Sequence, residues 1–487
     1  MTVRNRLAYL FIPISFVCLL ATTADADVKL ASIFGDSMVL QREMPVPVWG
    51  WAEPGEEVTV RFGGQTQKTA AGKDGRWQVK LDALTTSAEG QTMTVMGRNT
   101  IEVKDVLVGE VWICSGQSNM EWGLGGSLHG EEEVAAANHP QIRLFDVPGH
   151  TTAPLPQDSC PGSWRVCQPS SAGGFSAVGY FFGRRLQQEL KVPIGLVGSN
   201  WGGTRIEPWT SPAGFHSVPE LNTIADQADA YTETTKVDGS SPSAIYNAMV
   251  HPLGPFALRG AIWYQGESNG GEGESYYHKM QALVNGWRQQ FNPDLAFYWV
   301  QLANFQQPND NPAGGDGWAM LREAQRKALG MKHTGMAVII DIGQAEDIHP
   351  RNKQDVGWRL AQAALHQTYG RKEIVAGGPL YTSHKVEGNA IRLAFDDVGS
   401  GLIVGEKTGL EPTKEVKEGK LQRFAISGAD RQWHWADAKI EGDTVVVTSP
   451  EVAQPVAVRY AFSMNPAGAN LYNREGLPAS PFRTDDW

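Results

Sequence analysis

A serine that follows an apolar run in the first third of the chain has the setting of a nucleophile. Residues 111–117 read as a buried strand that ends in a glycine-bearing turn, and Ser118 stands where this turn should open into a helix. Such a turn exposes a small side chain at the end of a sheet and points backbone N–H groups toward the same place. The sequence therefore predicts that Ser118 attacks an electrophile.

A serine hydroxyl is a weak nucleophile, so it needs a general base and donors for the developing oxyanion. His349 lies in a predicted loop between a strand and a helix, and Pro350 suits the first turn of that helix. We expect Nε2 of His349 to take the Ser118 proton while a carboxylate or a carbonyl steadies Nδ1–H. Asp347 is the first choice for this supporting group, with Glu346 second and a backbone carbonyl third. Taken alone, the Asp-His pair is also compatible with a helix cap beside a surface histidine.

The elements that must position these side chains alternate between strand and helix from about residue 106 to residue 377. This alternation predicts the α/β class, a parallel sheet with helices on both faces. In such sheets the chemistry gathers at the carboxyl ends of the strands. Four segments that follow predicted strands should therefore converge: Ser118, the pair Gly202 and Gly203, residues 265–267, and residues 341–349.

Short alternating strands with turn residues between them lie on both sides of the α/β segment. They predict two β-sandwich-like domains, at residues 27–105 and 378–487, around a catalytic domain at residues 106–377. The N-terminal β-domain carries aromatic residues that could stack on sugar but are more often core residues. These are Trp49, Trp51 and Trp77.

The first 26 residues have the pattern of a targeting segment. Arg4 and Arg6 precede the apolar residues 7–20, and residues 24–26 match a small-x-small cleavage site. This pattern predicts a secretory signal peptide at residues 1–26, and a protein that is exported to the periplasm or the medium. After cleavage we expect no association with a membrane.

The bulk properties exclude several classes of partner. The 487-residue chain has a formal net charge of -11, which argues against nucleic acid and anionic membranes as partners. No CxxC pair or His/Cys cluster has zinc-like spacing, so we expect neither a metal nor another cofactor. Cys160 and Cys167 flank a short Pro/Gly segment, and in an oxidising compartment they form either a small disulfide or two free thiols. Cys114, in the strand before Ser118, fits a core position.

Four motifs together resemble the sialate O-acetylesterase family of SGNH hydrolases, and the resemblance covers nearly the whole chain after residue 26. It implies a flavodoxin-like parallel sheet. It also implies an esterase that removes O-acetyl groups from carbohydrate, either sialic acid or plant polysaccharides such as xylan and xyloglucan. The motifs are Gly-Gln-Ser-Asn-Met at 116–120, Asn-Trp-Gly-Gly-Thr at 200–204, Trp-Tyr-Gln-Gly-Glu-Ser-Asn at 263–269, and Asp-Ile-His-Pro-Arg-Asn-Lys at 347–353.

The resemblance also implies a role for each motif. Ser118 is the nucleophile and His349 the base. The Ser118 N–H, an N–H of the Gly202-Gly203 turn and the Gln265 side chain form the oxyanion hole. An acetyl-Ser118 ester forms, and water activated by His349 then releases acetate.

The chain departs from the simplest family pattern in two motifs. Many members have Asp three residues before the histidine, where this chain has Glu346. The third motif offers Gln265 and Glu267 in place of a lone Asn. Glu267 could orient Gln265 or Arg205, bind substrate, or lie in a buried ion pair.

Arg205 could pair with the carboxylate of a sialic acid, or be tied to Glu207 or Glu267. Tryptophans near the motifs could stack on a sugar ring, although each is more often a core residue. They are Trp122, Trp201, Trp209 and Trp263.

Two other functions are compatible with parts of this pattern. A non-catalytic carbohydrate-binding protein on a degenerate hydrolase scaffold would suit the two β-domains, but both Ser118 and His349 are present. A peptidase or lipase is disfavoured because no Gly-x-Ser-x-Gly surrounds Ser118. We therefore expect an acetylated carbohydrate as the partner, with the sugar and the oligomeric state left open.

Overall fold

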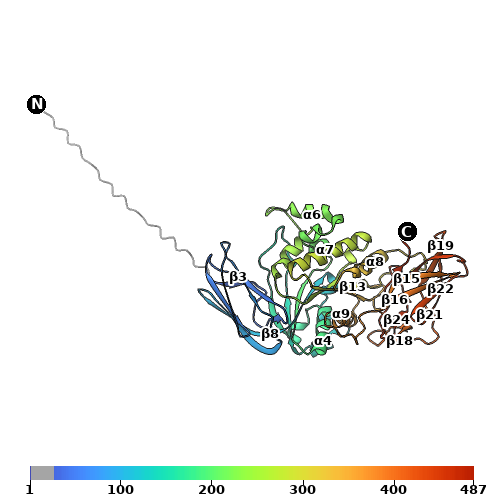
Figure 1. Ribbon diagram of the computed structural model, residues 1–487, viewed down its shortest axis with the longest axis horizontal. Helices are drawn as coiled ribbons and strands as arrows, with labels where there is room; N and C mark the ends of the chain where they lie inside the picture. Colours follow the sequence, from blue (N-terminus) through green and yellow to red (C-terminus); the bar gives the residue numbers. More distant parts are fainter. Residues whose placement is uncertain (2–26) are drawn as a thin grey trace.

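The computed structural model describes residue 1 and residues 27–487, so the predicted signal peptide and its cleavage site lie outside the described residues. In Figure 1 the N-terminal strands (blue) lie at one end, the helices in the middle and the C-terminal strands (red) at the other end. Within the described chain, no helix combines the length and the apolar character that crossing a membrane requires.

A large mixed sheet forms the centre of the protein. Six of its strands run parallel in the order β9-β11-β8-β12-β13-β14, and β10 adds an antiparallel strand at the β9 edge. From β8 the chain first adds strands on one side and then on the other, so a topological switch point lies at β8. The strands are β8 (Thr100–Gly116), β9 (His139–Asp146), β10 (Ser163–Cys167), β11 (Ile194–Asn200), β12 (Gly260–Tyr264), β13 (Ala296–Gln301) and β14 (Thr334–Val338).

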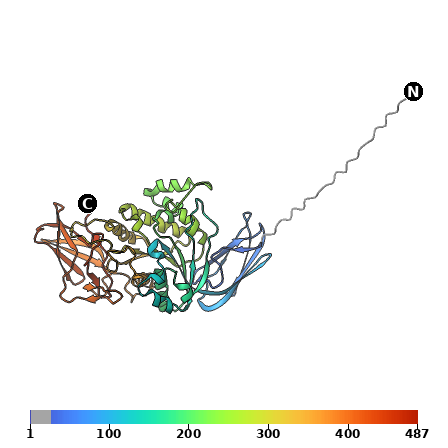
Figure 2. The same cartoon turned by 180° about the vertical axis from the view of Figure 1, so that it is seen from behind.

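Helices cover both faces of this sheet, as the strand-helix alternation predicts. Helices α4 (Ala177–Leu190) and α9 (Lys353–Gln367) lie below the sheet in Figure 1, and α6 (Asn222–Asp229), α7 (Glu274–Gln290) and α8 (Ala319–Lys327) lie above it. Figure 2 shows the same arrangement from behind. The shorter helices are α1 (Ser118–Glu121), α2 (Gly130–Ala136), α3 (Pro169–Ala172) and α5 (Pro212–His216).

Strand β8 is much longer than the sequence pattern suggests, because it belongs to two sheet regions. Its first residues pair with β7 and its last residues pair with β11 and β12. Asp105 has a positive φ of 56° and lies within the part that pairs with β7, which reaches Val108, whereas the pairing with β11 begins at Glu110. The domain boundary predicted at residues 105 and 106 therefore falls inside a continuous strand. Residues 106–116 are buried throughout, as expected for a parallel strand covered on both faces.

The N-terminal region is built from short strands, as the alternation of apolar and polar residues predicts. A three-stranded sheet has the order β1-β3-β6, while β4, β5 and β7 extend the β8 region and β2 pairs with β8. The bounds are β1 (Lys29–Leu30), β2 (Val39–Gln41), β3 (Val46–Trp51), β4 (Glu57–Phe62), β5 (Gln65–Ala70), β6 (Arg76–Leu81) and β7 (Ser87–Met96).

After α9 the chain forms only strands, in three small sheets with the orders β15-β16-β22-β21, β18-β17-β24 and β20-β19-β23-β25. The strands of these three sheets pair antiparallel. The bounds are β15 (Leu380–Glu387), β16 (Ala390–Asp396), β17 (Leu402–Glu406), β18 (Lys414–Glu415), β19 (Phe424–Gly428), β20 (Trp433–Trp435), β21 (Asp437–Glu441), β22 (Thr444–Thr448), β23 (Pro455–Tyr460), β24 (Leu471–Asn473) and β25 (Phe482–Arg483).

Of the two alternatives for Cys160 and Cys167, the structure has the free thiols. Both side chains are buried, and the Cys160 Sγ lies 4.0 Å from the Ser32 Oγ instead of bonding to a second sulfur. Cys114 is a buried core residue, and burial raises the pKa of its thiol, which makes it a poor nucleophile.

Candidate active site

Ser118 is the first residue of α1, and only Gln117 separates it from the carboxyl end of β8. The turn depends on Gly116, which has a φ of 141°. A side chain there would also collide with the backbone carbonyl of Tyr264 on the neighbouring strand β12. The Gln117 N–H bonds to that same carbonyl at 3.0 Å. The turn that presents Ser118 is therefore fixed to the third motif, as convergence at the strand ends requires.

His349 lies in the loop between β14 and α9 and reaches Ser118 across the sheet edge. Its Nε2 is 2.9 Å from the Ser118 Oγ, which is within the range for proton transfer. The Trp122 ring stacks on the imidazole with centroids 5.1 Å apart. Burial and the charge of Lys353 lower the pKa of His349, while Asp347 opposes them. The imidazole is thus predominantly neutral at neutral pH and can accept a proton.

The acid behind His349 has an unusual geometry. Asp347 uses its Oδ1 to accept the backbone N–H of His349 at 2.8 Å, whereas the same oxygen is 3.7 Å from Nδ1. That separation is too long for a hydrogen bond. The other carboxylate considered, Glu346, accepts a hydrogen bond from the Gln307 side chain. Asp347 is therefore bonded to the backbone of the His349 loop, and its charge raises the pKa of the imidazole.

The glycine turn after β11 lies against the nucleophile. A Cβ built on Gly202 would lie 3.2 Å from the Ser118 Cβ, so a side chain there would crowd the nucleophile. Gly203 has a φ of 77°, which L-residues with side chains rarely adopt. The Gly202 N–H donates a 2.6 Å hydrogen bond to the Oε2 of Glu121. Motif reasoning did not single out Glu121, although it is only three positions after Ser118 and contacts the glycine turn.

Gln265 does not face the nucleophile. Its Nε2 donates to the Thr204 carbonyl at 3.1 Å and to the Asn269 Oδ1 at 2.8 Å, and its Oε1 accepts from the Tyr276 hydroxyl at 2.9 Å. Both amide hydrogens are therefore occupied in a fully buried position. The expectation that this side chain donates to the oxyanion does not match the geometry, because β12 ends with Gln265 directed into the core.

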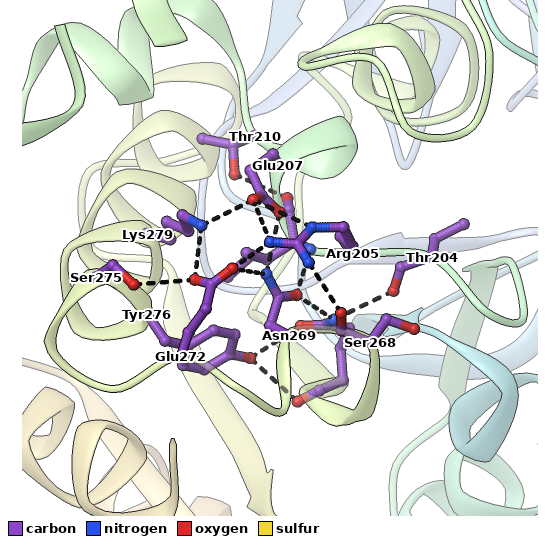
Figure 3. Close-up of polar contacts among 12 residues, drawn as sticks. Thr204, Arg205, Glu207, Thr210, Ser268, Asn269, Glu272, Ser275, Tyr276 and Lys279 are labelled. Carbon is purple, nitrogen blue, oxygen red and sulfur yellow. Dashed lines mark hydrogen bonds and ion pairs between the residues drawn. The ribbon is translucent and has the colours of Figure 1, made fainter. Parts of the chain in front are cut away.

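Arg205 likewise belongs to a structural network, which Figure 3 shows. Its guanidinium pairs with Glu207 at 3.0 Å and with Glu272, and it donates to the Ser268 carbonyl at 3.1 Å. Lys279 joins the same two carboxylates at 2.8 and 2.6 Å. The network connects the glycine turn to the third motif and to α7. The alternative that tied Arg205 to Glu207 is thus the observed one.

A buried side-chain cluster joins three of the motifs behind the nucleophile. The Asn119 Nδ2 donates to the Glu267 Oε1 at 2.6 Å and to the Ile348 carbonyl at 3.0 Å. The Lys353 ammonium donates to the Asn119 Oδ1. Burial raises the pKa of Glu267, and burial lowers the pKa of Lys353 to about 7. Glu267 thus orients Asn119, and not Gln265 or Arg205.

The four tryptophans near the motifs have different positions. Trp209 and Trp263 are fully buried core residues. Trp122 and Trp201 are partly exposed, and Trp201 stacks on His150 with centroids 4.9 Å apart. Trp122 and Trp201 are thus the two that can contact a ligand beside Ser118.

The chain is similar to a known protein family over its central part and to curated proteins over most of its length. Residues 108–366 match the family model described as carbohydrate esterase, sialic acid-specific acetylesterase. The human sialate O-acetylesterase is 33% identical, and the alignment covers 93% of this chain and 92% of the human protein. The Pongo abelii sialate O-acetylesterase is 32% identical over the same shares.

A solved structure extends the likeness to the whole fold. The crystal structure of a carbohydrate acetylesterase from Xanthomonas citri has a TM-score of 0.82 and 42% identity, covering 94% of this chain and 100% of the other. The resemblance inferred from the four motifs is therefore confirmed. The chain belongs to the sialate O-acetylesterase family of carbohydrate esterases.

Proposed function

We propose that the protein removes O-acetyl groups from carbohydrate by nucleophilic catalysis at Ser118. The observation that carries the proposal is the 2.9 Å hydrogen bond between the Ser118 Oγ and the His349 Nε2. A neutral imidazole at this distance is poised to take the hydroxyl proton. Family membership supplies the substrate class, since the similar proteins are named sialate O-acetylesterase and carbohydrate acetylesterase.

The reaction has two halves. In the first, the Ser118 Oγ attacks the acetyl carbonyl carbon while His349 takes the hydroxyl proton. The tetrahedral intermediate collapses to acetyl-Ser118, and His349 returns the proton to the departing sugar oxygen. In the second, water gives a proton to His349 and attacks the acetyl-Ser118 carbonyl, and acetate leaves as Ser118 regains its proton.

Backbone N–H groups stabilise the oxyanion in this mechanism. The N–H of Ser118, at the start of α1, and the N–H of Gly202 are the proposed donors. Support comes from the close approach of Gly202 to Ser118 and from the absence of a side-chain cap on α1. Gln265 is not among the proposed oxyanion donors, because both of its amide hydrogens are bonded to other groups. Asp347 has the proposed role of holding the His349 loop and stabilising the imidazolium by charge.

We assign the central sheet to the flavodoxin-like SGNH hydrolases, with the site at the β8 switch point. We assign residues 27–105 and 378–487 to flanking β-domains and residues 106–377 to the catalytic domain. The basic and apolar pattern of residues 1–26 supports export to the periplasm or the medium.

Acetate release from a panel of esters tests the proposal. The panel contains O-acetylated sialic acid, acetylated xylan and acetylated xyloglucan, so that it also identifies the sugar. Ser118→Ala and His349→Ala should lose nearly all turnover, while Ser170→Ala and His129→Ala, both at exposed positions, should retain it. Wild-type turnover in Ser118→Ala would refute the mechanism. Binding of the polysaccharides without any acetate release would favour a carbohydrate-binding protein instead.

A further inference from the structure

The N–H group that the mechanism assigns to the substrate oxygen is already occupied by a side chain of the protein. The Gly202 N–H donates to the Glu121 Oε2 at 2.6 Å. This is the short distance of a charge-assisted hydrogen bond. A Cβ built on Gly202 would lie 3.0 Å from the Glu121 Oε2 and 3.2 Å from the Ser118 Cβ, so the carboxylate oxygen and the nucleophile lie on the same side of this glycine. This carboxylate oxygen stands in for the acyl oxygen that the reaction must place near this N–H.

A second contact holds the carboxylate in this position. The Glu121 Oε1 is 2.6 Å from the His150 Nε2, and the His150 ring lies parallel to Trp201, with an interplanar angle of 2°. The backbone N–H of Trp201 bonds to the Gly116 carbonyl at 3.1 Å. Glu121 is therefore held at both oxygens by segments that are themselves fixed to the end of β8.

The Glu121 carboxylate can nevertheless move away from the Gly202 N–H. The Glu121 side chain is 35% exposed and the His150 side chain is 45% exposed, so both have access to water. The bond to Gly202 is made by one carboxylate oxygen only. A rotation of the Glu121 side chain can release the N–H while the second oxygen stays near His150.

We propose that Glu121 is an internal occupant of the oxyanion site that competes with the acetate product. The inference rests on the proposed function, because it takes the Gly202 N–H as an oxyanion donor. The substrate ester is neutral and displaces the carboxylate to bind. Acetate is an anion that needs the same N–H, and the charge of Glu121 beside it opposes its binding. After deacylation the return of Glu121 to Gly202 expels the product.

Inhibition by acetate measures this competition directly. The assay follows p-nitrophenyl acetate hydrolysis at increasing sodium acetate concentrations, with sodium chloride keeping the ionic strength constant. The variants are Glu121→Ala, Glu121→Gln and His150→Ala. The matched control is Glu131→Ala, which removes an exposed glutamate of α2 that lies ten positions later in the sequence. Thermal melting verifies that each variant is folded.

For Glu121→Ala, we expect the inhibition constant of acetate to fall at least tenfold and the KM for the ester to fall with it. Glu121→Gln keeps the shape of the side chain without its charge, so its inhibition constant for acetate should lie between those of wild type and Glu121→Ala. His150→Ala should shift the inhibition constant in the same direction by a smaller factor. Glu131→Ala should match wild type.

Two results would overturn the proposal. One is an active Glu121→Ala variant whose acetate inhibition equals that of wild type. The other is a folded Glu121→Ala or Glu121→Gln variant as inactive as Ser118→Ala, which would make Glu121 part of the chemistry. Neither result touches the role of Ser118, which the loss of ester hydrolysis in Ser118→Ala tests separately.

Discussion

Replacing Asp347 by Asn should cost this enzyme far less than the same change costs a Ser-His-Asp triad. The amide retains an oxygen that can accept the His349 backbone N–H, so the 2.8 Å bond that shapes the loop can persist. What disappears is the negative charge 3.7 Å from Nδ1. The substitution therefore separates the electrostatic effect of Asp347 on His349 from its effect on the loop conformation.

The size of that contribution follows from the distance and the exposure. The side chains of His349 and Asp347 are 27% and 39% exposed, so a dielectric close to that of water applies. At 3.7 Å two unit charges then interact by about 1 kcal/mol. This energy corresponds to about 0.8 of a pKa unit and to about sixfold in rate.

The assay is the pH dependence of kcat/KM with p-nitrophenyl acetate. Because Asp347 raises the pKa of His349, Asp347→Asn should move the acid limb to lower pH by less than one unit and lower the plateau by about sixfold. Glu346→Gln, which changes a carboxylate bonded to Gln307, is the control and should match wild type. Where Asp accepts the Nδ1–H of a triad, this change costs roughly 10⁴ in kcat. A loss of that size would refute the geometry described above.

Three further substitutions test other parts of the site. Lys353→Met removes a charge that lowers the pKa of His349, so the acid limb of kcat/KM should move to higher pH, and an unchanged profile would contradict this. Gly202→Ala keeps the backbone N–H but places a methyl group 3.2 Å from the Ser118 Cβ, so the turn must shift and its N–H must move away from the oxyanion. This displacement should lower kcat in initial-rate assays by up to roughly 10², the cost of removing one oxyanion donor. Lys279→Met leaves Glu207 and Glu272 with one cation fewer and should lower the free energy of unfolding by about 3 kcal/mol in urea titrations. Burial raises the pKa of Glu207, but the hydrogen bonds and charge from Lys279 and Arg205 outweigh burial and lower this pKa from 4.5 to about 2. Ionised Glu207 therefore stabilises the wild type at neutral pH, and this stabilisation is lost as the pH falls from 4.5 toward 2. Over the same range the free energy of unfolding of Lys279→Met should fall less than that of the wild type.

The convergence of the site could be predicted from the sequence because it follows from chain topology. Parallel strands bring their carboxyl ends to one edge, so segments that follow β8, β11, β12 and β14 must meet there. The hydrogen bond between Ser118 and His349, which are 231 residues apart, is the result. The alternation of strand and helix predicted for residues 106–377 is also observed, since the apolar periodicity of these elements is regular.

The directions of individual side chains could not be predicted in the same way. Gln265 is directed into the core because Tyr276 and Asn269, on later elements, offer it better partners than the site does. Arg205 binds Glu272, which is 67 residues away, a pairing that only the folded α7 region creates. Similarly, β8 runs across a predicted domain boundary because its pattern changes from half-buried to fully buried without a break.

The central claim is that Ser118 carries the acetyl group between the two half-reactions, and trapping that intermediate tests it most directly. Wild-type protein mixed with an O-acetylated substrate is quenched in acid within its first turnovers, and peptides are analysed by mass spectrometry. The mechanism predicts the mass of one acetyl group on the peptide that contains Ser118, and none in Ser118→Ala. An acetyl group on another residue, or full acetate release by Ser118→Ala, would contradict the claim.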